Sequence, residues 1–181
     1  MFKYFGVISV LLTWTALGYM LVRTYSKDHG SLSRHAASSK RAAIFFTAVL
    51  LPTGVAFCAW SMAWLGPHIG LTILFSIVLV ATLLCLLLTV LITDTPGWRR
   101  KAHHHIAYTM AVLFMPLALL ITIAPGVSLP ARVLCAVMFA YMVTSYTWVV
   151  LMHHFTDKFL IFQISYIMVF QMVALVAGYL G

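Results

Sequence analysis

Histidine is the residue type in this chain with the most potential chemistry. Eight histidines occur among 181 residues, and five of them flank two apolar segments: His103, His104 and His105 precede one, and His153 and His154 follow another. Neutral imidazole is a good ligand for zinc, copper and iron, and two axial imidazoles can hold a b-type haem. One interpretation of this arrangement is therefore a haem b or transition-metal site. His105 and His153 are the best axial pair, with His103, His104 and His154 as further ligands.

The same histidines have an alternative interpretation that needs no cofactor. Imidazoles at a helix end can contact lipid phosphates, and at a carboxyl-terminal end they also suit the helix dipole. Their spacing matches no exact metal motif, and Cys58, Cys85 and Cys135 are isolated from one another. The sequence therefore favours no cofactor, with haem or a metal as the alternative. In that alternative, Asp94 or Asp157 would orient a ligand imidazole by hydrogen bonding.

A second candidate site is a basic stretch just before the histidines. The stretch comprises Trp98, Arg99, Arg100 and Lys101, and five residues separate it from the apolar segment 69–92. Each cation near a membrane surface is worth about 1 kcal/mol of attraction to anionic lipid. These residues are predicted to bind lipid headgroups, or else they serve only to orient the chain in the membrane.

Polar side chains within the apolar segments form a third candidate site. Such residues fasten helices by hydrogen bonds worth about 0.6 kcal/mol each, or they supply the few polar groups of a ligand pocket. The predicted pocket for an amphipathic ligand comprises Tyr108, Tyr141, Ser145, Gln163 and Tyr166.

The elements that position these residues follow from composition. Hydrophobic residues make up 64% of the chain and charged residues 8%, against about 25% charged in soluble domains. A helix that crosses a bilayer needs about 20 apolar residues. Six segments qualify, at about 4–22, 42–65, 69–92, 105–123, 129–152 and 159–180. We expect one all-α integral membrane domain of six spans, with a basic loop at 23–41.

Charge predicts how this bundle is oriented. With six spans, most basic residues fall in loops on one side, namely Arg23, Lys27, Arg34, Lys40, Arg41, Arg99, Arg100, Lys101 and Lys158. Lys3 and Arg132 fall on the other side. Basic loops face the cytoplasm, so both termini are expected outside, with a bacterial inner membrane as the location. Because the net charge of +8 is spread between apolar segments, nucleic acid is not expected as a partner.

The positions of the acidic residues argue against some classes of function. Asp28, Asp94 and Asp157 lie near the ends of predicted spans, whereas an ion pathway usually needs a carboxylate within the membrane. No nucleophile triad or phosphate loop is present, so an enzyme is not favoured. We expect a protein that interacts with membrane lipids or forms part of a membrane complex, with another subunit or with itself. A haem or metal redox protein and a small transporter are the alternatives.

One segment resembles a known family. Within 87–120, an apolar span ends in the Asp-Thr-Pro-Gly sequence of residues 94–97, a basic linker follows, and a histidine opens the next span, which contains Ala107 and Phe114. This segment resembles the bacterial six-helix membrane family of unknown function related to DRAM-like proteins. The resemblance implies a compact bundle with no established enzymatic activity. The triple histidine and the expected outward amino terminus depart from the family pattern.

Overall fold

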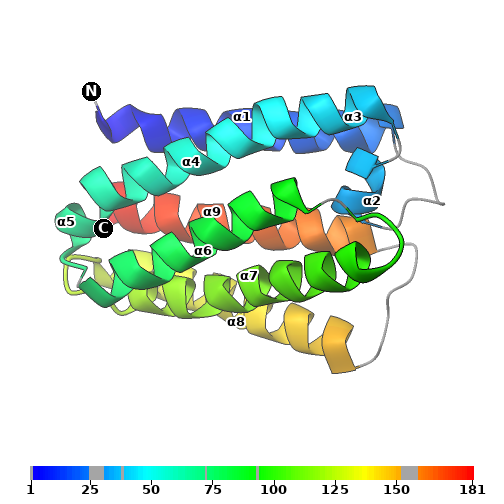
Figure 1. Ribbon diagram of the computed structural model, residues 1–181. Helices are drawn as coiled ribbons and strands as arrows, with labels where there is room; N and C mark the ends of the chain where they lie inside the picture. Colours follow the sequence, from blue (N-terminus) through cyan, green and yellow to red (C-terminus); the bar gives the residue numbers. More distant parts are fainter. Residues whose placement is uncertain (1, 25–30, 38, 72, 93, 152–158) are drawn as a thin grey trace.

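The structure is a computed structural model that describes residues 2–24, 31–37, 39–71, 73–92, 94–151 and 159–181 (Figure 1). Its described residues form helices and connecting turns without any strand. The all-α fold predicted from the sequence is therefore confirmed.

Nine α-helices and three other helical segments follow one another along the described chain. The α-helices are α1 (Phe5–Thr24), α2 (Leu32–Ala37), α3 (Lys40–Phe45), α4 (Leu51–Trp60), α5 (Gly66–Ile69), α6 (Ile73–Leu91), α7 (Trp98–Thr122), α8 (Leu129–Leu151) and α9 (Phe159–Leu180). A 3₁₀ turn, η1, spans Phe2–Tyr4, and π-helical turns form η2 (Phe46–Leu50) and η3 (Ser61–Leu65). Helices α3 to α5 and the two π turns join into one long helix, Lys40–Ile69.

Five helices are long and apolar enough to cross a membrane. They span Lys40–Ile69, Ile73–Leu91, Trp98–Thr122, Leu129–Val150 and Leu160–Leu180. These helices indicate an integral membrane protein and match five of the six predicted segments. The first predicted segment, 4–22, forms α1 but is not among the five. The sixth span therefore stays a prediction.

Helix α9 lies at the centre of the bundle (Figure 1). Half of its membrane window is buried, against 17–22% for the other four candidate spans. It packs against α1, α7 and α8, while α1 packs on α4 and α6 on α7. Small side chains permit this position, because Ala174 and Ala177 are fully buried and let neighbouring backbones approach closely.

The helix Lys40–Ile69 widens before its proline. Pro52 lies at the start of α4, directly after the π turn η2. A proline ring crowds the carbonyl four residues earlier and removes one hydrogen bond. That carbonyl belongs to η2, so the wider π turn accommodates the proline without ending the helix.

Helix α7 begins earlier than its apolar pattern predicts. The sequence places the span at 105–123, whereas the helix starts at Trp98 and carries the basic and histidine residues in its first turns. Hydropathy detects the part of a helix that lies in hydrocarbon, and the helix itself continues into the interface. The preceding Gly97 has φ of +97° and ψ of −148°, a conformation essentially restricted to glycine.

The two ends of the bundle differ in charge. Helix α2, the starts of α3, α7 and α9 and the end of α8 share one end, whereas the two termini and α5 lie at the other (Figure 1). We call the first of these the basic end, because it carries Arg34, Lys40, Arg41, Arg99, Arg100 and Lys101. Because short connections join long antiparallel helices, successive loops lie at alternate ends of the bundle.

Candidate functional site: an amphipathic cavity

A cavity of about 510 Å³ lies within the bundle. Ligand sites in proteins are typically about 300–1,000 Å³, with mostly apolar walls and a few placed polar groups. Residues from α1, α2, α4, α6, α7, α8 and α9 line this cavity, together with residues of η2 and the loop before α7. Its composition changes along its length, since the polar groups gather mainly at the basic end.

Aromatic side chains form much of the apolar wall. The rings of Phe114 and Phe170 stack with centroids 4.4 Å apart, and Phe57 meets Phe170 edge-on at 5.9 Å. Nearer the basic end, the rings of Phe162 and Tyr166 lie 5.5 Å apart. Aromatic pairs at these distances hold one another in place, so this wall is rigid.

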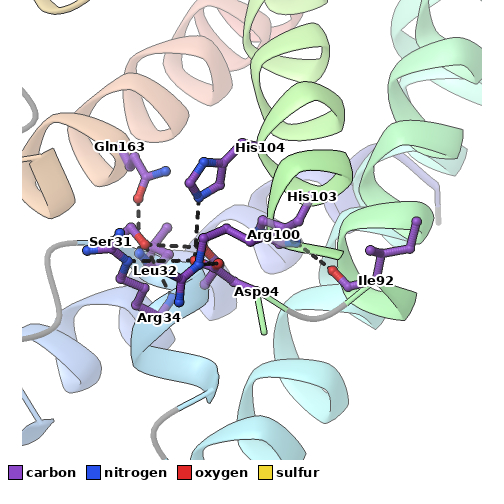
Figure 2. A network of polar contacts seen from close by, with 10 residues as sticks. Ser31, Leu32, Arg34, Ile92, Asp94, Arg100, His103, His104 and Gln163 are labelled. Carbon is purple, nitrogen blue, oxygen red and sulfur yellow. Dashed lines mark hydrogen bonds and ion pairs between the residues drawn. The ribbon is translucent and has the colours of Figure 1, made fainter. Parts of the chain in front are cut away.

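Asp94 is the centre of the polar end. It lies in the loop between α6 and α7, and its side chain is fully buried. Arg100 Nε donates to Asp94 Oδ1 at 3.1 Å, and Arg34 Nε lies 3.8 Å from Oδ2 (Figure 2). A buried carboxylate needs such partners, because an unpaired buried charge is costly. The two arginine side chains remain 43% and 47% exposed.

Two of the predicted metal ligands have structural partners here. His104 Nε2 lies 3.6 Å from Asp94 Oδ2, and His104 lines the cavity. His103 is buried, and its Nδ1 lies 2.6 Å from the carbonyl oxygen of Ile92 (Figure 2). A carbonyl can only accept, so this ring nitrogen carries the proton. His103 thereby ties the start of α7 to the end of α6.

Helix α2 covers the polar end of the cavity. The backbone N–H of Leu32 donates to Gln163 Oε1 at 3.0 Å (Figure 2). Ser33 Oγ lies 3.5 Å from Asp94 Oδ2. Leu32 also packs into a small apolar cluster with Leu17 and Leu160. This short helix is therefore held by contacts with α1, α9 and the loop before α7.

A second polar spot lies deeper in the bundle. Trp14 Nε1 donates to Gln171 Oε1 at 2.8 Å, and Gln171 is buried in the cavity wall. Nearby, the Tyr166 hydroxyl donates to the carbonyl of Ala111 at 2.9 Å. Trp14 and Gln171 are 157 positions apart in the chain, so the sequence alone does not pair them.

Three of the five predicted pocket residues line this cavity, namely Tyr108, Gln163 and Tyr166. Tyr141 and Ser145 are not among the residues that line it. Tyr141 is exposed and donates to Ser165 Oγ at 3.1 Å, and Ser145 donates to the carbonyl of Met142. The reason is helical phase, since the inward face of α8 carries Met142, Tyr146 and Val149.

The predicted haem pair is not brought to this cavity as far as the structure describes it. His105 is exposed on α7 and is absent from the cavity wall, whereas His153 and His154 lie outside the described residues. Among the described residues, no three His, Cys, Asp or Glu side chains form a group that could hold a metal ion. The cofactor hypothesis therefore remains a prediction.

The predicted headgroup residues divide into two sets. Trp98, Arg99 and Lys101 are exposed at the basic end, and the Arg99 guanidinium lies 5.8 Å from the Trp98 ring centroid. Arg100 instead turns inward to Asp94. Sequence reasoning missed Arg34 and gave Asp94 no more than an orienting role. The signal available was an acidic residue enclosed by basic ones at the end of an apolar segment.

Comparison with known proteins adds no relative. The chain matches no family model, no curated protein and no solved structure.

Proposed function

We propose that this protein is a non-enzymatic integral membrane protein that binds a single-chain anionic lipid in its interhelical cavity. The observation that supports this most directly is the cavity itself, which joins an aromatic wall to a polar end that contains the half-exposed Arg34. Arg100 lies next to this end, because it pairs with Asp94 of the cavity wall. We further propose that the basic end faces the cytoplasm of a bacterial inner membrane, because cytoplasmic loops carry the excess of Lys and Arg.

The charge of the polar end favours an anionic headgroup. The Asp94 side chain is wholly buried, whereas those of Arg34 and Arg100 are about half exposed. An entering headgroup can therefore contact the half-exposed Arg34 guanidinium in the cavity wall, whereas the Asp94 carboxylate is buried. Guanidinium groups bind carboxylate and phosphate in a planar, two-pronged geometry. A fatty acid and a lysophospholipid both carry such a group.

The polar end also has to supply most of the selectivity. A ligand that enters from the bilayer gains little from the apolar wall, because lipid tails are as apolar as the cavity. Shape and charge pairing remain as sources of affinity. The rigid aromatic pairs define the shape, and Arg34 and Arg100 define the charge.

Stearate binding to the full-length protein in mild detergent tests the proposal. Removing one charged hydrogen-bond partner costs about 1.5–3 kcal/mol, so Arg34→Gln or Arg100→Gln should weaken stearate binding about tenfold or more. Arg99→Gln is the matched control, because Arg99 is exposed beside Trp98, whereas Arg34 and Arg100 pair with Asp94 of the cavity wall. Equal weakening by Arg99→Gln, or no stearate binding at all, would contradict the proposal. Native mass spectrometry reads out both the added ligand and any lipid that co-purifies.

A further inference from the structure

Two glutamines of α9 lie in the cavity wall at different depths. Gln163 lies at the polar end, and Gln171 lies deeper. The helical rise of 1.5 Å per residue places them about 12 Å apart along the helix axis. Gln171 is 5% exposed, so its side chain is largely shielded from solvent.

The hydrogen bonds of the two glutamines show which atom of each side-chain amide, oxygen or nitrogen, has a partner. Gln171 Oε1 accepts from the indole N–H of Trp14, and Gln163 Oε1 accepts from the backbone N–H of Leu32. Both partners are donors only, so the amide oxygen, and not the NH₂ group, must face them. The NH₂ group of each glutamine is a pair of N–H donors, and among the described residues only the amide oxygens have an assigned partner.

We propose that the cavity selects an anionic lipid that carries a second oxygen acceptor part-way along its chain. This inference rests on the proposed function and deepens it. The NH₂ group of Gln163 joins Arg34 and Arg100 at the anionic head, and the NH₂ group of Gln171 donates to a ketone, ester or ether oxygen farther down. Trp14 is a positioning residue, since it holds Gln171 through the amide oxygen.

Desolvation makes Gln171 selective. A buried donor without an acceptor carries a desolvation penalty, and hydrocarbon offers no water to relieve it. A plain alkyl chain beside Gln171 leaves that penalty in place, whereas a chain with an oxygen at the right depth removes it. An oxygen beside the wall hydroxyls of Thr13, Thr82 or Tyr166 gains less, because each of these hydroxyls already donates to a backbone carbonyl.

The test compares stearate with oxostearates whose ketone lies near the carboxyl, near mid-chain or near the methyl end. In the wild-type full-length protein, we expect one ketone position, near mid-chain, to bind about fivefold more tightly than stearate. Gln171→Leu should abolish that preference, because the leucine side chain has no donor for a ketone oxygen. Gln171→Met provides a second variant that keeps the side-chain length. Thr144→Val on the exposed face of α8 is the control, because Thr144 donates within its own helix.

The outcomes separate this inference from the proposed function. Equal binding of stearate and every ketone by the wild-type protein would overturn the inference alone. A preference that survives in both Gln171→Leu and Gln171→Met would also overturn it. No binding of any probe would overturn the proposed function and the inference together.

Discussion

At the scale of single residues, Asp94 organises the polar end of the cavity. Its side chain is fully buried and has Arg34, Arg100 and His104 within 4 Å. These partners come from α2 and α7, so one carboxylate joins two helices. Removing the carboxylate leaves the guanidinium groups without their acceptor.

Asp94→Asn should therefore destabilise the protein. Breaking a fully buried ion pair costs about 3–5 kcal/mol. Here we expect on the order of 2 kcal/mol, since both arginines are half exposed and water screens them. Thermal unfolding of the protein in detergent measures this loss. A wild-type unfolding midpoint in Asp94→Asn would show that the cluster contributes nothing to the fold.

His103 and His105 provide a matched pair of residues on α7. His103 is buried against the Ile92 carbonyl, whereas His105 is exposed. His103→Phe should cost about 1–3 kcal/mol, because it leaves the buried carbonyl without its donor. His105→Phe should change the unfolding midpoint little. Similar effects of both substitutions would argue against the structural role assigned to His103.

The haem and metal hypothesis is also decided at this scale. It depends on His105 with His153, and His153 lies outside the described residues. A visible absorption spectrum and a metal analysis of the purified protein distinguish the alternatives. A Soret band that disappears in His105→Ala would support haem ligation. A protein without bound haem or metal would leave the histidines as interfacial and packing residues.

At the scale of elements, α2 closes the polar end although it is too short to be stable alone. Isolated helices below about 12–15 residues are marginal in water, so α2 depends on what holds it. Leu32 supplies both kinds of contact, a backbone hydrogen bond to Gln163 and a place in an apolar cluster. The stability of this element is therefore tertiary in origin.

Leu32→Ala should loosen α2 selectively. Losing a buried leucine side chain typically costs about 2–5 kcal/mol, and the loss falls on a short helix that otherwise packs mainly on α3. Hydrogen–deuterium exchange should show faster exchange of the α2 amides, with α6 and α7 unchanged. Uniformly faster exchange across the bundle would mean that α2 is not a separate element.

The start of α7 depends on a backbone conformation. Gly97 has positive φ, and no atom lies within 4 Å of a Cβ placed there. Gly97→Ala should thus cost about 1–3 kcal/mol from backbone strain alone. Gly18→Ala is the control, because it lies inside α1 with open space around it and should stabilise by about 0.5–1 kcal/mol. If Gly97→Ala and Gly18→Ala changed the free energy of unfolding in the same direction, the strained conformation assigned to Gly97 would be contradicted.

At the scale of the whole molecule, the two ends of the bundle carry different charge and should face different compartments. Lys101 is exposed at the basic end, and Ser128 is exposed in the connection between α7 and α8 at the other end. Phe2 is exposed before α1, so its side of the membrane reports whether α1 is the sixth span.

Cysteine labelling of intact cells checks this topology. In a background without the native cysteines, Ser128→Cys and Phe2→Cys should react with an impermeant reagent, and Lys101→Cys should react after permeabilisation. Labelling of Lys101→Cys from outside would reverse the orientation. Protection of Phe2→Cys together with labelling of Ser128→Cys would show that α1 does not cross the membrane.

Much of this architecture was predictable because hydropathy is a property of segment length and composition. Apolar runs of about 20 residues specify membrane helices whatever their neighbours, and basic residues between alternate runs mark one end. The cavity was predictable in part. Tyr108, Gln163 and Tyr166 stood out as polar residues in apolar helices, but Tyr141 and Ser145 had the same signal and lie elsewhere.

The rotation of each helix about its own axis, and the neighbours against which it packs, were decided by the tertiary structure alone. Which face of α8 points inward depends on its packing against α7 and α9, because hydrophobic residues occur on all its sides. The contacts that define the site join Trp14 to Gln171, Leu32 to Gln163 and Arg34 to Asp94 across long stretches of chain. Local periodicity carries no information about such pairs. In a membrane bundle, the packing of the helices determines which polar side chains become hydrogen-bond partners.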